Sequence, residues 1–399
     1  MTPGPGIART PLPKGFTAGG INCGVRKYRP DLGLLLSETD AVVAGVFTQN
    51  KCKAASVVYS QGILPSENIR AIVTNSGQAN TATGSRGWDD NWKMVLAAAQ
   101  TVGCLPHQVV TASTGVIGVP MDIDKIVDAM PSFPERMGQS AEPFALAILT
   151  TDLVPKTVTT IVQLQDGEVR ITGICKGSGM IHPNMATMLG YLLTDAKLTS
   201  TLAKALLVEA TRYSFNMISV DGDTSTNDAV FLMANGMSGV SVQESADIAK
   251  FKKALIELSQ MLAQSIARDG EGSTKLVEVS LKGANEEELA RKAVRGLTLS
   301  PLVKSAIHGE DPNWGRVIAR LGAEDIPTSC FEKMNISIQG TLVFQDGLAL
   351  SFDRPGLKTL LRSENVKIEI DLKDGDFHAT GWGCDLSSKY VDINSEYST

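Results

Sequence analysis

Apolar and polar residues along the chain follow a helical period in two long stretches. Residues 86–104 and 246–268 place apolar side chains three or four positions apart, which is the spacing of an amphipathic helix. In the first stretch these are Trp88, Trp92, Val95, Leu96, Ala99 and Val102. In the second they are Ile248, Phe251, Leu255, Leu258, Leu262 and Ile266. The pattern predicts two amphipathic helices.

Other apolar runs are short, rich in β-branched residues and separated by turn signals. An Asp-Gly pair favours the type I′ turn of a β-hairpin, because both central residues of that turn have positive φ. We therefore expect three antiparallel hairpins and a mixed α/β (α+β) fold, not a doubly wound parallel sheet. The three turns are expected at Asp166-Gly167, Asp346-Gly347 and Asp374-Gly375.

Composition excludes several classes of protein. The chain has 399 residues, 43% of them hydrophobic, and a formal net charge of −6, so neither a nucleic acid nor an anionic membrane would find a basic surface. No apolar run reaches the 18 or so residues that span a bilayer, and no apolar segment of a secretory signal follows the N-terminus. Six cysteines lie far apart without a C-x-x-C pair, a pattern typical of free thiols in the cytoplasm and not of a metal site.

One segment contains a candidate nucleophile. Residues 176–196 read KGSGMIHPNMATMLGYLLTDA and place Ala186 directly before Thr187 after a glycine-rich approach. A threonine hydroxyl is a weak nucleophile unless a base lies beside it, and cutting the chain before Thr187 would supply its own α-amine as that base. An α-amine has a pKa of about 7.7–8.0, against about 10.4 for lysine, and is better matched to proton transfer at neutral pH.

The same segment resembles the self-cleavage site of the ornithine acetyltransferase family, and the resemblance extends over essentially the whole chain. It implies an αββα layered sandwich similar to that of N-terminal-nucleophile hydrolases, self-cleaved between Ala186 and Thr187. The products would be an α chain of residues 1–186 and a β chain of residues 187–399, assembled as a heterotetramer of two α and two β chains. The further motifs, in family order, are GFTAGGINCGVR (15–26), VTNSGQANTATG (73–84), ASTGVIGVPM (112–121), ILTTD (148–152), SVDGDTSTND (219–228), RDGEGSTK (268–275), HGEDPNWGR (308–316) and DINSEYST (392–399).

The resemblance also implies a reaction. Members of the family move an acetyl group from N2-acetylornithine to glutamate in arginine biosynthesis, through an acetyl-threonine intermediate that would form here on Thr187. Some members also acetylate glutamate from acetyl-CoA and others do not, and the sequence leaves both alternatives open. No cofactor is expected, because acetyl-CoA would be a substrate.

Residues matching the family's site follow by position. Thr114 and Gly115 match the oxyanion-hole pair, in which a hydroxyl and a backbone N–H would stabilise the tetrahedral intermediate. Lys176 would pair with the substrate carboxylate and Glu271 would hold an ammonium group. The remaining substrate contacts match Thr150, chosen over its neighbour Thr151, together with Thr187, Asn394 and the C-terminal Thr399.

Three other features favour structural roles. The segment SVDGDTSTND has Thr226 and Leu232 where an EF-hand loop needs glycine and glutamate, so we expect a hydrogen-bonded turn near the site. His182 lies five residues before Thr187, but an α-amine base makes a histidine base unnecessary. His308 has no partner at metal-ligand spacing, and we expect it to be structural or to line the pocket.

Two alternatives to an acetyltransferase stay open at this point. A related self-cleaving aminopeptidase or amidohydrolase would use the same architecture, although such enzymes typically have serine at the nucleophile position. An uncleaved binding module is the other alternative, which the intact set of site residues disfavours.

Overall fold

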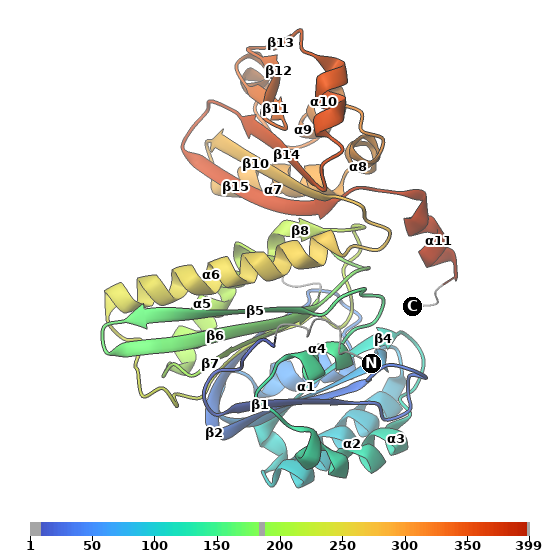
Figure 1. The fold of residues 1–399 in the computed structure, drawn as a ribbon, viewed down its shortest axis with the longest axis vertical. Coiled ribbons are helices and arrows are strands. Elements are labelled where there is room, and N and C mark those ends of the chain that lie inside the picture. Colours follow the sequence, from blue (N-terminus) through green and yellow to red (C-terminus); the bar gives the residue numbers. More distant parts are fainter. Residues whose placement is uncertain (1–8, 183–187, 397–399) are drawn as a thin grey trace, which may run out of the picture.

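A computed structural model describes residues 9–182 and 188–396, and it contains two β-sheets with helices on their faces (Figure 1). The mixed α/β class is therefore confirmed. The first sheet consists of β1 (Phe16–Ile21), β2 (Leu32–Phe47), β3 (Ser66–Gln78), β4 (Val109–Val116), β5 (Lys156–Leu164), β6 (Gly167–Lys176), β7 (Leu189–Thr194) and β9 (Ala229–Ala234). Its order is β4-β3-β2-β9-β7-β6-β5, with β1 paired to β2.

The second sheet is formed mainly by the C-terminal third of the chain. It consists of β8 (Ile218–Ser219), β10 (Leu276–Ala284), β11 (Asn335–Ile338), β12 (Thr341–Gln345), β13 (Leu348–Ala349), β14 (Asn365–Asp371) and β15 (Phe377–Cys384), in the order β13-β12-β11-β14-β10-β15-β8. Parallel and antiparallel neighbours occur in both sheets.

Eleven α-helices are present in the described part of the chain. They are α1 (Ala55–Ile63), α2 (Gly84–Val102), α3 (Ile123–Ala129), α4 (Glu142–Ala147), α5 (Ser200–Arg212), α6 (Ser245–Arg268), α7 (Glu287–Leu299), α8 (Pro301–His308), α9 (Trp314–Leu321), α10 (Arg354–Leu360) and α11 (Ser388–Glu396). Short 3₁₀ helices occupy Pro106–Gln108, Met130–Arg136, Phe215–Met217 and Thr328–Glu332. None of the helices in the described part of the chain has the length and apolar character needed to cross a bilayer.

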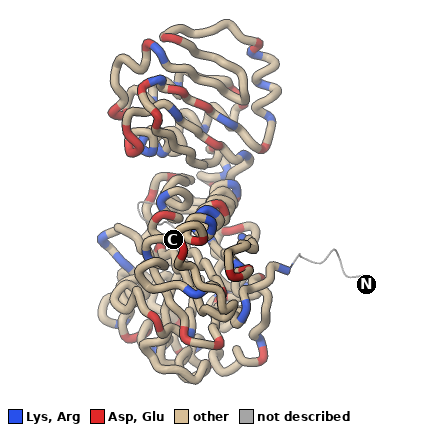
Figure 2. Tube along the Cα trace, turned by 90° about the vertical axis from the view of Figure 1, so that its left-hand side faces the viewer, with Lys and Arg blue, Asp and Glu red and all other residues tan. Residues whose placement is uncertain are grey.

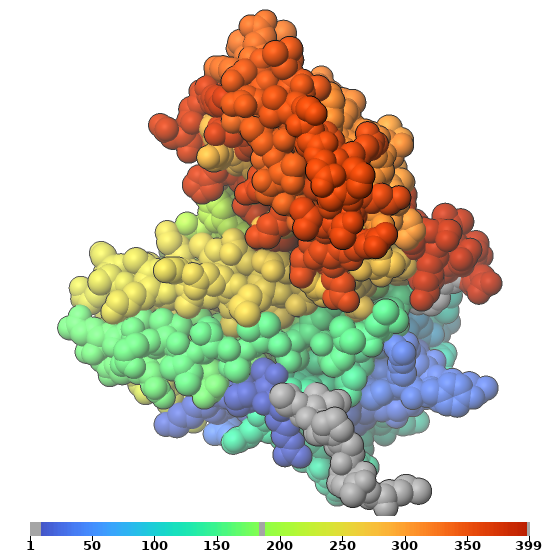
Figure 3. Space-filling view, turned by 45° about the horizontal axis from the view of Figure 1, so that its top comes forward, coloured from blue at the N-terminus to red at the C-terminus, as the bar shows by residue number. Residues whose placement is uncertain are grey.

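The alternation of side chains along β7 and β9 explains the layers of the first sheet. Tyr191 and Phe231 point to the face covered by α1 and α4, and Leu192 and Leu232 point to the face covered by α5 and α6. The far side of α6 contacts β15, so this helix lies between the two sheets (Figures 1 and 3).

Both predicted helices are confirmed, as α2 and α6. In α6 the apolar row is buried, apart from the half-buried Ile248. In α2 the inner side is formed by Val95 and Ala99, whereas Trp88, Trp92 and Leu96 are exposed.

The three Asp-Gly predictions have different outcomes. Asp346-Gly347 joins β12 to β13, and both residues have positive φ, as a type I′ turn requires. Asp166 lies in the turn of a confirmed hairpin of β5 and β6, but positive φ occurs only at Gly167, so the expected turn type is wrong there. The prediction of a third hairpin, at Asp374-Gly375, is wrong.

The third turn joins two strands that are not neighbours. Strand β10 lies between β14 and β15 and pairs with both. Gly375 is needed for space, because a side chain there would overlap the carbonyl of Ala284 at the end of β10. An Asp-Gly pair determines a local reversal of the chain, and it carries no information about a strand that arrives from elsewhere in the sequence.

The charged residues are spread over the molecule. On the side drawn in Figure 2, basic and acidic residues are intermixed over both sheets. This distribution agrees with the small net charge and offers no extended basic face on that side.

Candidate active site

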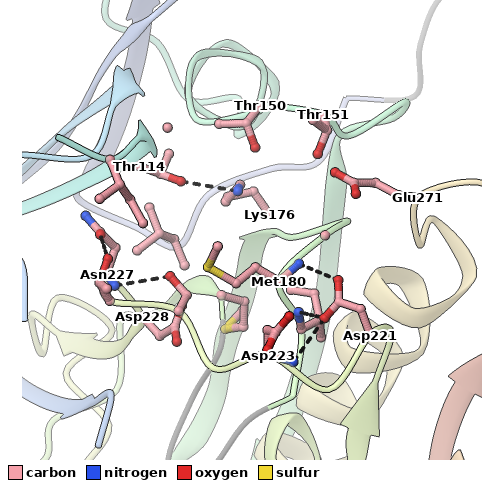
Figure 4. A pocket seen from close by; sticks show the side chains of 18 of the residues that line it. Thr114, Thr150, Thr151, Lys176, Met180, Asp221, Asp223, Asn227, Asp228 and Glu271 are labelled. Atoms are coloured by element: carbon pink, nitrogen blue, oxygen red, sulfur yellow. Dashed lines mark hydrogen bonds between the residues drawn. The ribbon is translucent and has the colours of Figure 1, made fainter. Parts of the chain in front are cut away.

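A pocket of about 180 Å³ brings together residues from distant parts of the chain (Figure 4). It contains every predicted site residue that the structure describes. These are Thr114, Gly115, Thr150, Lys176, Glu271 and Asn394. Ala186, Thr187 and Thr399 lie outside the described residues, so their roles stay predictions. Met188, which follows Thr187 in the sequence, also lines the pocket.

Thr114 and Gly115 lie where strand β4 reaches the pocket. The parallel pairing of β3 with β4 becomes irregular at Gln78, which is opposite both Thr114 and Val116. Gly115 has a φ of +129°, and any side chain there would overlap the backbone of Gly77. A bulge of this kind redirects the chain at the end of a strand, and here only glycine fits it.

Lys176 ends strand β6 and reaches the same place. Its Nζ donates to the hydroxyl Oγ1 of Thr114 at 3.3 Å and lies 4.0 Å from a carboxylate oxygen of Asp152. Burial lowers the pKa of Lys176, and the opposing charge of Asp152 does not fully compensate. The ammonium therefore lies in a site where an additional anion would be favoured.

A buried ionic network supports Lys176 from behind. Lys156 Nζ contacts the carboxylates of Asp152 at 2.8 Å and Asp269 at 2.6 Å. Asp152 also accepts from the backbone N–H groups of Thr150 and Gly177. Burial raises the pKa of Asp152, but the charge of Lys156 and then that of Lys176 outweigh it and hold the pKa below its ordinary value. This network links the segment of Thr150 to the end of β6.

Both Thr150 and Thr151 line the pocket, so the structure does not distinguish between them. The segment is held by Arg26, whose guanidinium donates to the carbonyl oxygens of Leu149 and Thr150. Arg26 belongs to the GFTAGGINCGVR motif, which thus supports the pocket wall.

Glu271 and Asn394 close another side of the pocket. Asn394 Nδ2 donates to Glu271 Oε2 at 2.8 Å, and Ser387 Oγ just before α11 donates to the carbonyl of Gly272 at 2.6 Å. A side chain at Gly179 would overlap the carboxylate of Glu271. These contacts hold α11 beside the pocket, away from the strands that precede it (Figure 3).

The segment 219–228 forms the hydrogen-bonded turn near the site that the sequence predicted. The Asp221 carboxylate accepts from the backbone N–H groups of Met180 and Ile181 at 2.6 and 2.8 Å. The turn also lines the pocket with Asp223 and Asp228; no motif in the sequence marked either residue as part of the site.

Tyr390 was likewise missed. It lies one helical turn before Asn394 on α11 and lines the same pocket. The spacing of four residues, which places both side chains on one face of a helix, was the available signal.

His182 and His308 both contact polar groups among the described residues. His182 Nδ1 lies 3.1 Å from Ser219 Oγ, and Nε2 lies 3.1 Å from Arg295. Burial first, and the charge of Arg295 second, lower the pKa of His182 to about 4. His308 Nδ1 lies 2.7 Å from a carboxylate oxygen of the buried Asp385, and His308 does not line this pocket, which agrees with the predicted structural role.

No group of three or more His, Cys, Asp or Glu side chains within residues 9–182 and 188–396 is arranged to hold a metal ion. The pocket is lined by a hydroxyl, an ammonium group, carboxylates and the backbone near the end of strand β4. These groups can orient an amino acid and stabilise a tetrahedral oxyanion, which defines the chain as a candidate acyl-transfer enzyme.

Comparison with known proteins agrees with this class. The sequence model of the ArgJ family matches residues 17–399. The arginine biosynthesis bifunctional protein ArgJ of Synechocystis sp. is 42% identical, over 97% of this chain and 97% of its own. The protein of the same name from Thermus thermophilus is 43% identical, over 97% of this chain and 99% of its own. The chain therefore belongs to the ArgJ family, and the resemblance to the ornithine acetyltransferase family is confirmed.

A solved structure is also similar. It is the crystal structure of ornithine acetyltransferase from Mycobacterium tuberculosis, complexed with ornithine. It has 35% sequence identity and a TM-score of 0.41, covering 44% of this chain and 94% of that chain.

Proposed function

We propose that the chain is a glutamate N-acetyltransferase that moves the acetyl group from N2-acetylornithine to glutamate in arginine biosynthesis. One observation carries the proposal most directly: Thr114, Gly115 and Lys176 meet in a pocket that Met188 also lines, so the pocket adjoins the start of the predicted β chain. The family to which the chain belongs agrees with this activity.

The nucleophile would be Thr187, in two successive reactions. In the precursor its Oγ attacks the carbonyl carbon of Ala186, the peptide nitrogen leaves as the new α-amine, and water then hydrolyses the ester. In the mature enzyme the α-amine takes the proton of the same Oγ as this oxygen attacks the acetyl carbon of N2-acetylornithine, and ornithine then leaves with that proton. The amine of glutamate then attacks the acetyl carbon and gives a proton to the α-amine, which passes it to Oγ as the ester bond breaks and N-acetylglutamate leaves.

The pocket residues would support both transfers. The Thr114 hydroxyl and the Gly115 N–H would donate to the oxyanion, and Lys176 would pair with the substrate carboxylate. Glu271, held by Asn394, would accept the ammonium of ornithine. Thr150 and Thr399 would complete the substrate contacts, so truncation before Thr399 should weaken binding.

Acetyl-CoA is proposed as a second acetyl donor. The curated relatives are named bifunctional, which favours both reactions over the first alone. Acetyl-CoA would act as a substrate, and the proposed mechanism uses no bound cofactor. We also propose that the enzyme works in the cytoplasm, in line with its six free cysteine thiols. Its proposed assembly is a heterotetramer of two α and two β chains.

Two assays test the proposal. Purified protein should form N-acetylglutamate from glutamate with N2-acetylornithine, and also with acetyl-CoA. A denaturing gel should separate two fragments, which a binding module that stays uncut would not give. Release of ornithine in the absence of glutamate at the full rate would instead indicate an amidohydrolase, the alternative that uses water as the acceptor.

A further inference from the structure

Asp228 is a buried carboxyl group in the pocket with an unused bonding position. The residue is 3% exposed, and its Oδ2 has no hydrogen-bond partner among residues 9–182 and 188–396. Its side chain is drawn in the close view of the pocket (Figure 4). A buried charged group normally has a hydrogen-bond or ionic partner, or it becomes neutral. An ionised Asp228 would therefore need a hydrogen-bond donor at Oδ2, and the described residues do not provide one.

The surrounding charges do not supply that donor. Two groups favour the ionised form of the Asp228 carboxyl and so act to lower its pKa: the charge of Lys176 and the hydroxyl of Ser225. The lysine itself donates to Thr114. The other titratable groups of the pocket are Asp221, Asp223, Glu271 and Tyr390. Because burial outweighs the effects of Ser225 and Lys176, the pKa of Asp228 is raised well above its ordinary value.

Asp228 also has a defined position in the first sheet. The next residue, Ala229, donates from its backbone N–H to the carbonyl of Met188 at 3.0 Å. The parallel ladder of β7 and β9 begins there, with Leu189 paired to Ala229. Asp228 therefore lies at the end of the ladder where the proposed β chain starts, and both its side chain and that of Met188 line the pocket.

We propose that Asp228 is the acceptor for a primary ammonium group in the reactive pocket. An ammonium carries three donors and a full positive charge, and a charge-assisted bond is roughly twice as strong as a neutral one. This inference rests on the proposed function, which provides two sources of such a group. One is the α-amine that cleavage would free at the start of the β chain, and the other is the ammonium of the amino-acid substrate.

The two sources have different consequences. A carboxylate beside the α-amine raises the pKa of that amine and directs its lone pair, so Asp228 would be a positioning residue for every acetyl donor. A carboxylate that binds the substrate ammonium acts only on donors that carry one.

The test compares Asp228→Asn with a matched control, Asp166→Asn, which removes the same charge from an exposed turn between β5 and β6. Two acetyl donors are used: N2-acetylornithine, which has an ammonium, and p-nitrophenyl acetate, which has none. For an α-amine partner, Asp228→Asn should lower kcat/KM roughly ten- to a hundredfold with both donors and move the acidic limb of both pH profiles to lower pH. For a substrate partner, only N2-acetylornithine should be affected, through KM.

A spectroscopic measurement covers the case in which Asp228→Asn fails to fold. An uncleaved Thr187→Ala variant is first measured without substrate. Its infrared difference spectrum should contain the carbonyl stretch of a protonated carboxylic acid. That band should disappear in the cleaved wild type, or when N2-acetylornithine saturates the site. A band that persists in both states, or an Asp228→Asn enzyme that behaves like Asp166→Asn with both donors, would overturn the inference. A wild-type protein that neither cleaves itself nor transfers acetyl groups would instead refute the proposed function.

Discussion

The ammonium nitrogen of Lys176 donates to the hydroxyl oxygen of Thr114 across 3.3 Å. Because the hydroxyl oxygen accepts this bond, its own proton is free to point into the pocket, where it can donate to a developing oxyanion. The lysine therefore orients the hydroxyl that the proposed mechanism needs.

Replacement of Thr114 by alanine tests this donor. Loss of one oxyanion donor should lower kcat by about a hundredfold or more, with a much smaller change in KM, because the donor is used mainly in the transition state. Steady-state kinetics with N2-acetylornithine and glutamate measure both constants. Thr114→Ser keeps the hydroxyl and should retain most of the rate; a Thr114→Ala enzyme with unchanged kcat and raised KM would reassign the residue to substrate binding.

Gly115→Ala tests the bulge beside Thr114. The new methyl group would meet the backbone of Gly77 at a φ of +129°, so we expect a loss of about 1–3 kcal/mol in unfolding free energy together with loss of acetyl transfer. Gly118→Ala is the control, since it has a φ of +80° with open space around it. Equal stability and activity of the two variants would show that the close approach at Gly115 is unimportant.

Lys156→Met tests the buried network. Without the lysine, the carboxylates of Asp152 and Asp269 lose their central cation, which should cost about 3–5 kcal/mol in unfolding free energy. Denaturant unfolding gives the value. The exposed pair of Lys253 and Glu257, 3.9 Å apart, provides a comparison: Lys253→Met should stay within about 0.5 kcal/mol of wild type. A similarly small effect at Lys156 would contradict a structural role for the network.

The lowered pKa of His182 predicts that the stability of the protein depends on pH. Its pKa is lowered to about 4 in the folded protein, against about 6.5 when unfolded. Between these values the unfolded chain binds more protons, so stability is fully present above about pH 6.5 and falls as the pH decreases towards 4. His182→Gln lacks the titrating ring and should lose less stability over that interval, measured by unfolding at several pH values. Identical slopes for the two proteins would contradict the prediction.

The sequence predicted those elements whose signals are local. The two amphipathic helices and the turn at Asp346-Gly347 follow from residue spacing and turn chemistry within short windows. The failed hairpin at Asp374-Gly375 required knowledge of β10, a strand about ninety residues earlier in the sequence. Likewise, the position of α6 between two sheets depends on packing that no short window records.

The candidate site shows the same division. The motifs located Thr114, Lys176, Glu271 and Asn394, and the fold brings them to one pocket. Asp228 was read only as part of a structural turn, because nothing in the local sequence reveals an unpartnered buried oxygen. That property depends on the surroundings that the fold creates around Asp228.

Intact-mass spectrometry can detect the covalent acetyl-threonine intermediate itself. Protein incubated with N2-acetylornithine alone should consist of two chains, with residues 187–399 carrying exactly one additional acetyl group on Thr187 and an equimolar amount of ornithine released. Addition of glutamate should remove that acetyl group and yield N-acetylglutamate. A single uncut chain that transfers acetyl groups at the full rate, or an active cleaved enzyme without acetylated Thr187, would contradict a covalent mechanism on Thr187.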